Sequence, residues 1–112
     1  MRLSLDVAEL AELIKANAEV CLIDVRKPPA RALSGLIIPN SKRESSIEAA
    51  TWWHRYRSVE VVVYCVHGHE VSQGVCRVLK SRGIEARYLV GGFEAWQEAG
   101  MEVEGLGEGD AA

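Results

Sequence analysis

Cys65 carries the strongest chemical signal in this chain, because of the pattern around it. It follows the apolar, β-branched and aromatic run 61–64, which predicts a buried strand. After the loop 66–69, apolar residues from Val71 to Leu79 recur at helical spacing and predict a helix. Backbone N–H groups converge at such a strand–helix junction and stabilise a thiolate. A cysteine there can also be a buried structural residue, but a loop with one glycine and two histidines favours a working thiol.

The loop could support nucleophilic chemistry without help from a metal or an organic cofactor. A thiol attacks as its thiolate, and the loop amides with the N-terminus of the following helix can stabilise that anion without a general base. Gly68 allows the loop to curl, since glycine tolerates backbone angles that strain other residues. Cys65, His67 and His69 are metal-ligating types, but three ligands so close together, with no distant fourth, make a weak zinc site.

The composition places the chain among ordinary soluble domains. With 112 residues, 48% hydrophobic and 26% charged, it is long enough for one domain with its own core. A net charge of −3 and the lack of a basic stripe argue against nucleic acid as a partner. Three cysteines at irregular spacing do not form a disulfide framework, and the N-terminus shows no signal peptide or membrane span. We therefore expect a cytoplasmic, monomeric protein with no membrane contact.

Alternating strand and helix patterns position the Cys65 loop within a larger frame. A capping box formed by Asp6 and Glu9 opens the first of these elements. The next patterns predict a strand at 20–25, a helix at 30–35, an extended piece at 36–39, and a helix at 45–56 whose start is capped by a serine pair. After these, the patterns predict a strand at 61–64, a helix that ends near residue 83, a strand at 86–90 and a last helix at 93–99. Such alternation predicts an α/β domain over residues 1–104, a parallel sheet with helices on both faces, and a flexible tail at 105–112.

The carboxyl ends of parallel strands meet at one edge of the sheet, where ligands bind. Three segments are therefore expected to share that edge: residues 24–26, the Cys65 loop, and residues 91–93. Asp24 and Arg26 on the first segment are interpreted mainly as a structural ion pair, with donor binding as the second role. Cys21 and Cys76 are expected in the core.

Three sequence blocks at these positions resemble the rhodanese-like family of single-domain sulfurtransferases. The blocks are residues 22–26, 63–68 and 89–96, and the likeness spans residues 4–103. It implies a central five-stranded parallel sheet, and a catalytic Cys65 that takes a sulfane sulfur from thiosulfate or a persulfide and passes it to a thiol, a cyanide-like acceptor or a protein acceptor. It also implies a substrate cradle made by Val66, His67, Gly68, His69, Glu70 and Val71. The loop is more loosely similar to a chromate-resistance-associated subgroup.

Glu70 departs from that family pattern, in which an arginine at the end of the loop attracts an anionic donor. A carboxylate near the sulfur would disfavour the thiolate and repel thiosulfate unless it pointed outward or paired with a cation. Protonated His67 or His69 could offset it. Alternatively, Glu70 only favours the helix N-terminus and both histidines are solvent-exposed. The segment 35–41 also departs from the family's Gly-His-Ile-Pro-Gly-Ala stretch, which affects local packing more than catalysis.

Two other functions were weighed against sulfur transfer. Phosphatases of related fold need an arginine that grips phosphate after a longer loop, and this chain has Glu70 and Val71 at the relevant positions. A phosphatase or arsenate reductase is therefore not expected. A catalytically weak rhodanese-like module for binding or redox sensing stays open because of Glu70, whereas Cys65 and Gly68 favour the enzyme.

Overall fold

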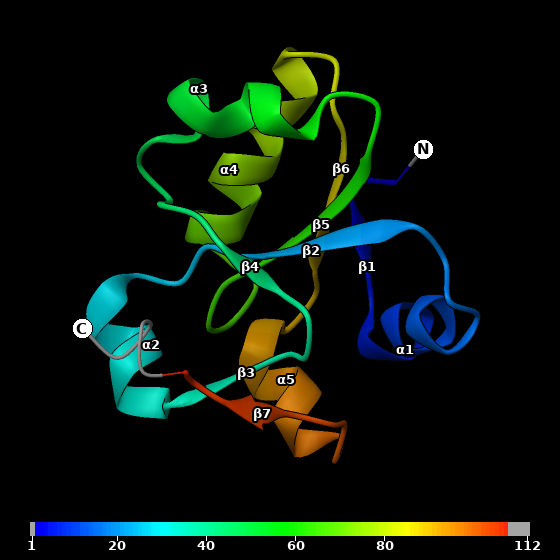
Figure 1. Cartoon of the computed structure of the whole chain (residues 1–112), viewed down its shortest axis with the longest axis vertical. Coiled ribbons are helices and arrows are strands. Elements are labelled where there is room, and N and C mark those ends of the chain that lie inside the picture. Colours follow the sequence, from blue (N-terminus) through cyan, green and yellow to red (C-terminus); the bar gives the residue numbers. More distant parts are fainter. Residues whose placement is uncertain (1, 108–112) are drawn as a thin grey trace.

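A computed structural model of the protein describes residues 2–107 (Figure 1). Helices and strands alternate along most of the chain: β1 (Ser4–Leu5), α1 (Val7–Lys15), β2 (Val20–Asp24), α2 (Pro28–Ser34), β3 (Leu36–Ile37), β4 (Lys42–Arg43), α3 (Ala49–Trp52), the 3-10 helix η1 (Trp53–Tyr56), β5 (Glu60–Tyr64), α4 (Glu70–Ser81), β6 (Glu85–Leu89), α5 (Gly92–Glu98) and β7 (Glu104–Gly105). The predicted capping box is present, since Asp6 and Glu9 each bond the other's backbone N–H.

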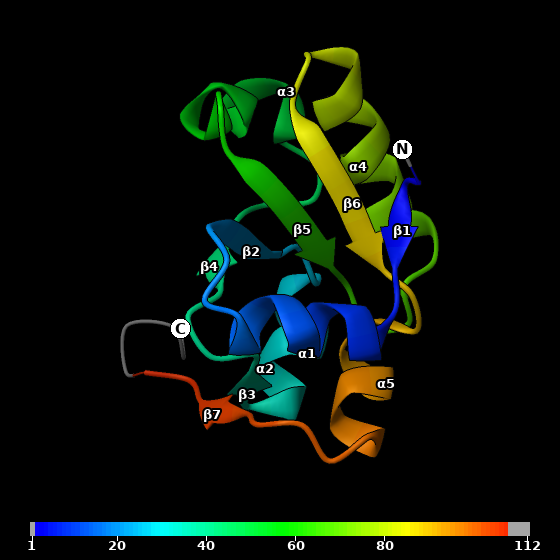
Figure 2. The ribbon, with the colours of Figure 1, turned by 90° about the vertical axis from the view of Figure 1, so that its right-hand side faces the viewer.

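A five-stranded parallel sheet forms the centre of the molecule, in the order β1-β6-β5-β2-β4. The most central strand is β5, which pairs with β2 on one side and with β6 on the other. Helices α3 and α4 lie on one face of the sheet, and α1 and α5 lie on the other (Figure 2). The predicted α/β fold, with a five-stranded parallel sheet covered on both faces, is confirmed.

Alternate residues of β5 divide the interior into two cores, because successive side chains of a strand point to opposite faces. Val61 and Val63 pack on the α3 and α4 side, and Cys65 continues that side. Val62 and Tyr64 pack on the α1 and α5 side. All five residues are buried, which explains why the strand reads as a continuous apolar run.

The structure differs from the predicted elements in detail. The extended piece expected at 36–39 is present as β3, and it lies outside the main sheet, where it pairs antiparallel with β7. The helix expected from residue 45 begins only at Ala49, with Glu48 as its N-cap and no side-chain cap, and its last turn is a 3-10 helix. Strands β1 and β4 have two residues each, too few for an apolar pattern to reveal them.

The C-terminal segment is held against α2 at its beginning. Gly105 belongs to β7, and the N–H of Leu106 donates to the carbonyl of Gly35 at the end of α2. The flexible tail was predicted from residue 105, and these first residues are instead hydrogen-bonded. Residues 108–112 lie outside the described residues, so for them the tail stays a prediction.

Candidate active site

Cys65 follows the last residue of β5 directly, and four loop residues separate it from α4. In the described part of the chain, the N–H groups of residues 66–69 have no hydrogen-bond acceptor. The first N–H groups of α4 follow them, and the first turn of a helix leaves such groups unsatisfied. A continuous run of free donors therefore starts next to the thiol, which is the arrangement that binds an anion.

The thiol of Cys65 lies at the bottom of this loop. The residue is only 5% exposed, and its Sγ–H donates to the hydroxyl of Ser72, with 3.1 Å between Sγ and Oγ. Ser72 is fully buried in the first turns of α4. Its hydroxyl can accept from the thiol or rotate and donate to the thiolate. Sequence reasoning missed Ser72, although a serine on the inner stripe of an amphipathic helix, close after a candidate nucleophile, is a readable signal.

Two glycines hold the Cys65 loop against the start of α5. Gly68 has φ +72°, and a Cβ there would lie 2.5 Å from the carbonyl oxygen of Leu89. Gly92 has φ +61°, and a Cβ there would lie 2.5 Å from the carbonyl oxygen of Cys65. Only glycine allows backbones to approach so closely in this conformation. Phe93 N–H then donates to the Cys65 carbonyl at 2.8 Å. The Cys65 loop and the turn at the start of α5 are thus packed together through their backbones, at the edge of the sheet where both segments were expected.

A pocket of ≈ 480 Å³ opens over the thiol. It is lined by residues of the loop and of α2 with its preceding residues, namely Arg26, Lys27, Ala30, Cys65, Val66, His67, His69, Glu70 and Val71. Every predicted cradle residue except Gly68 faces this pocket, because Gly68 packs against the α5 turn instead. Lys27 and Ala30 were not predicted, since their contribution depends on how α2 folds over the loop.

Glu70 is exposed at the first position of α4 and lines the pocket. Within residues 2–107 it forms no ion pair. Of the two histidines expected to offset it, His67 lies against Glu94 on α5 instead, with 3.1 Å between Nδ1 and Oε2, and His69 lines the same pocket without an ion pair to Glu70. Both partners of that pair are about half-exposed. The Glu70 carboxylate therefore lines the same pocket as the thiol without an ion-pair partner in the described residues, and it would still repel an anionic donor there.

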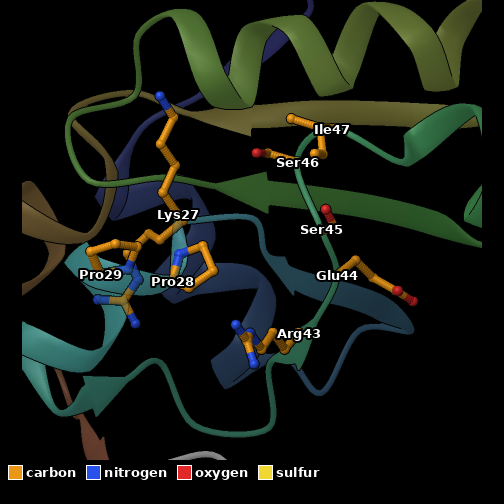
Figure 3. A pocket seen from close by; sticks show the side chains of 9 residues that line it. Lys27, Pro28, Pro29, Arg43, Glu44, Ser45, Ser46 and Ile47 are labelled. Carbon is orange, nitrogen blue, oxygen red and sulfur yellow. The ribbon is translucent and has the colours of Figure 1, made fainter. Parts of the chain in front are cut away.

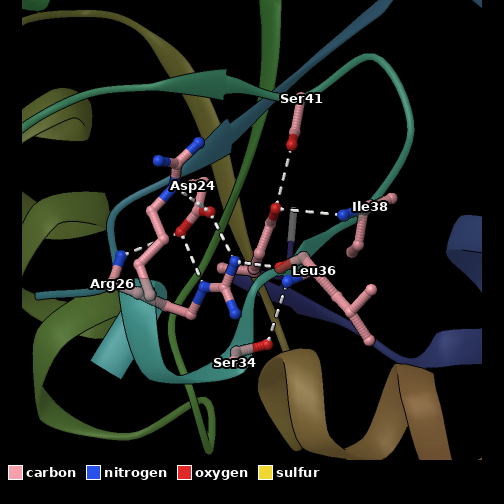
Figure 4. Close-up of polar contacts among 8 residues, drawn as sticks. Asp24, Arg26, Ser34, Leu36, Ile38 and Ser41 are labelled. Carbon is pink, nitrogen blue, oxygen red and sulfur yellow. Dashed lines mark hydrogen bonds and ion pairs between the residues drawn. The ribbon is translucent and has the colours of Figure 1, made fainter. Parts of the chain in front are cut away.

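Asp24 and Arg26 form a buried ion pair (Figure 4), and Arg26 also lines the pocket. Arg26 donates from Nε to Asp24 Oδ1 at 3.0 Å and from a terminal nitrogen to Oδ2 at 2.8 Å. It also donates to the Leu36 carbonyl at 2.7 Å and lies 4.4 Å from the ring centre of Phe93. Such contacts fix the guanidinium in the fold, while the same side chain lines the pocket. Its role toward a donor stays a prediction.

Arg31 completes this network and was missed from the sequence. Its Nε donates to Asp24 Oδ2 at 2.9 Å, so one carboxylate binds two buried guanidinium groups. Because it accepts hydrogen bonds from both arginines, Asp24 fixes the position of Arg26 relative to α2. Nothing in the charge pattern of the sequence marked Arg31 as buried, because its burial depends on how α2 returns it to Asp24.

Tyr64 connects the network to the segment after β3. Its hydroxyl accepts the N–H of Ile38 at 3.3 Å and bonds the hydroxyl of Ser41 at 2.9 Å (Figure 4). Burial, and then the negative charge of Asp24, raise the pKa of Tyr64 well above its ordinary value. The ring is thus a neutral structural group, and its two hydrogen bonds hold Ile38 and Ser41 against the end of β5.

No metal centre is built into the described residues. Among residues 2–107 no group of three His, Cys, Asp or Glu side chains gathers closely enough to hold an ion. No helix in the same range is long and apolar enough to cross a bilayer. The three cysteines are free thiols in the structure.

These features define a class: small α/β domains whose central parallel strand ends in a buried cysteine, an amide-rich loop and a helix. The model of the rhodanese-like domain family matches residues 6–99, and the chain belongs to this family. A curated relative, the thiosulfate sulfurtransferase GlpE of Vibrio cholerae, is 32% identical over 99 residues, which cover 84% of this chain and 88% of that protein.

Solved structures agree with this assignment. A rhodanese-related protein from Thermoplasma volcanium is 28% identical with a TM-score of 0.79, and the match covers 92% of this chain and 98% of that one. A rhodanese-like domain protein from Staphylococcus aureus is 25% identical with a TM-score of 0.78, covering 92% and 99%. The looser likeness to the chromate-resistance-associated subgroup finds no support in these comparisons.

Proposed function

We propose that the protein is a sulfurtransferase that carries a sulfane sulfur on Cys65. One observation carries the proposal: the Cys65 thiol lies at the base of a pocket, at the start of a run of backbone N–H groups that lack acceptors. The run can stabilise first the thiolate and then the terminal sulfur of a persulfide, which is also anionic. The relationship to a thiosulfate sulfurtransferase supports the same activity.

The transfer has two steps, and both conserve atoms and charge. The Cys65 thiolate attacks the outer sulfur of a donor R–S–SH, the donor S–S bond breaks, and its electron pair leaves with the thiolate R–S⁻. Cys65 then carries S–SH. An acceptor thiolate attacks that outer sulfur, the enzyme S–S bond breaks, and the Cys65 thiolate is restored. No external oxidant or reductant is needed, because one S–S bond is exchanged for another.

We propose a low-molecular-weight or protein persulfide as donor in preference to thiosulfate. Thiosulfate carries two negative charges and would bring them beside the unpaired carboxylate of Glu70. A persulfide presents at most one negative charge at the reacting sulfur. The acceptor is expected to be a small thiol, a cyanide-like nucleophile or a protein thiol.

A donor panel read by intact-protein mass spectrometry tests the activity. Incubation with glutathione persulfide, polysulfide and thiosulfate, each alone, should add the mass of one sulfur atom to the wild-type protein, most slowly with thiosulfate. Cys65→Ser should abolish the adduct. If no donor modifies the wild type, sulfur transfer is refuted and the alternative, a binding or redox-sensing module, takes its place.

The role of Glu70 is tested by charge reversal. Glu70→Arg should raise the rate with thiosulfate about tenfold, because a repulsion at the pocket becomes an attraction. Glu12→Arg, an equal charge change on the exposed face of α1, is the matched control and should alter that rate little. An unchanged or lower rate in Glu70→Arg would contradict the electrostatic explanation of donor choice.

A further inference from the structure

We propose that a second subsite, formed around Lys27 and Arg43, binds the carboxylate-bearing tail of a peptide-like thiol persulfide. This inference rests on the proposed function and names the class of donor more closely. The subsite is a pocket of ≈ 530 Å³ (Figure 3). Its walls come from the start of α2 and from β4 with the segment after it: Arg26, Lys27, Pro28, Pro29, Arg43, Glu44, Ser45, Ser46 and Ile47.

The two pockets are neighbours with a common wall. Arg26 and Lys27 line both the Cys65 pocket and the second pocket. A molecule whose sulfur reaches Cys65 can therefore place its remaining atoms past Lys27. Thiosulfate, with five heavy atoms, is too short to use both spaces, whereas a tripeptide-sized thiol is long enough.

The lining of the second pocket contains two cations without partners among the described residues, and its acid is already hydrogen-bonded to other residues. Within residues 2–107, neither Lys27 nor Arg43 has an ion pair or a side-chain hydrogen bond. The one acid in the lining, Glu44, is already engaged: it accepts two hydrogen bonds from Arg55 and one from the hydroxyl of Tyr56. Figure 3 shows the Arg43 side chain directed toward Pro28 and the Glu44 carboxylate directed away from it. Two cations are thus free to bind carboxylates.

The remaining walls suit the body of a peptide-like molecule. Ser45 and Ser46 offer hydroxyl groups, and Pro28 and Pro29 offer rigid apolar surface. Ile47 is 87% exposed, which leaves a large apolar side chain at the rim with nothing packed on it. Apolar walls with a few convergent polar groups are typical of a small-molecule site. A phosphate or sulfate ion alone would leave the apolar half of this lining unused.

This subsite also accounts for Glu70. One carboxylate of the donor would bind at Arg43, which lines the second pocket and not the Cys65 pocket, while Lys27 lies at the wall that the two pockets share, so part of the attraction for the anionic tail acts away from the reacting sulfur. The free cations can then select an acidic thiol persulfide even though the carboxylate of Glu70 lines the Cys65 pocket.

Binding is measured without chemistry in the Cys65→Ser protein. Isothermal titration with S-methylglutathione, which has two free carboxylates, is compared with its diethyl ester. We expect the acid to bind at least about fivefold tighter than the ester, and Lys27→Met with Arg43→Gln to remove about tenfold of the acid's affinity. Arg77→Gln, on the exposed face of α4, is the control and should leave both affinities unchanged. Equal affinity for acid and ester, or no loss in the double variant, overturns the subsite.

Sulfur uptake with Cys65 intact provides the second readout. The rate of persulfide formation from glutathione persulfide, divided by the rate from its diethyl ester, should fall about tenfold in Arg43→Gln with Lys27→Met. If the wild type forms no persulfide with either donor, the proposed function fails, and the titration still decides whether the subsite exists. If the wild type reacts but the ratio is unchanged in the variant, the subsite is refuted and sulfur transfer stands.

Discussion

Two buried cysteines of the same core cluster, Cys65 and Cys76, show how the surroundings of a thiol decide its chemistry. Cys76 lies on the inner face of α4, and its Sγ–H donates to the carbonyl of Ala86 on β6 at 3.3 Å. Burial raises the pKa of Cys76 to about 11. Cys65 lies at a strand end, donates to the Ser72 hydroxyl, and lines a pocket.

Burial alone therefore does not distinguish a structural thiol from a working one. A carbonyl is only an acceptor, so the hydrogen bond of Cys76 supports the neutral thiol, and burial outweighs the favourable effect of Lys80 and Arg77 on its anion. The Cys65 environment contains free N–H groups and a hydroxyl that can act as a donor. The difference arises because β5 ends at Tyr64 and leaves the following backbone outside any ladder.

The largest expected effect comes from removing each thiol in turn. Cys65→Ser should eliminate the sulfur adduct, whereas Cys76→Ala should retain most of the wild-type rate of formation and lose about 1 kcal/mol of stability. Intact-protein mass spectrometry measures the adduct, and urea denaturation measures the free energy of unfolding. An adduct that persists in Cys65→Ser and disappears in Cys76→Ala would reverse the comparison.

The next effect concerns the loop rather than the sulfur. Gly68→Ala forces a Cβ against the backbone of Leu89 and Gly91 at a positive φ, so we expect about 2–4 kcal/mol of destabilisation and at least about a hundredfold loss of sulfur uptake. Gly74→Ala on α4 is the matched control, because nothing lies within 4 Å of its Cβ position. It should keep full activity and gain about 0.5–1 kcal/mol of stability. Equal behaviour of the two variants would refute the backbone interlock.

The sequence predicted the parts of this comparison that depend on local pattern. The apolar run of β5, the stripe of α4 and the glycine in the loop were enough to place Cys65 at a strand–helix junction with Cys76 in the core. Central parallel strands are long and apolar, so their pattern is strong. Family resemblance then supplied the number of strands, since two-residue edge strands such as β1 and β4 carry no periodicity of their own.

What the sequence could not predict depends on contacts between distant segments. Lys27 lines the Cys65 pocket because α2 folds over the loop, and Arg31 is buried because its helix returns it to Asp24. Likewise, β3 leaves the main sheet because β7, far along the chain, supplies its partner. Propensity and spacing describe one segment at a time, so none of these pairings had a local signal.

A smaller effect is expected from Ser72, which positions the thiol. Ser72→Ala should slow alkylation of Cys65 by iodoacetamide at pH 7 about three- to tenfold, because the thiolate loses a hydroxyl donor. Ser81→Ala is the control: that exposed hydroxyl bonds the carbonyl of Val78 at the end of the same helix. An unchanged alkylation rate in Ser72→Ala would show that the hydroxyl only packs.

The smallest effect is a dependence of stability on pH that comes from Cys76. Its pKa is raised by burial from an ordinary 9.0 to about 11, so between these pH values the unfolded chain releases a proton that the folded protein retains. The contribution of this thiol to stability is complete below about pH 9 and declines as the pH rises toward 11. Urea denaturation at pH 7, 9 and 10.5 should show the free energy of unfolding of the wild type, relative to that of Cys76→Ala, falling by about 2 kcal/mol over this range. Comparison with this variant cancels the contribution of Tyr64, whose pKa is also raised and which both proteins share. An advantage that does not change with pH would mean that the Cys76 thiolate is tolerated in the core, and the contrast with Cys65 would then rest on access to the pocket alone.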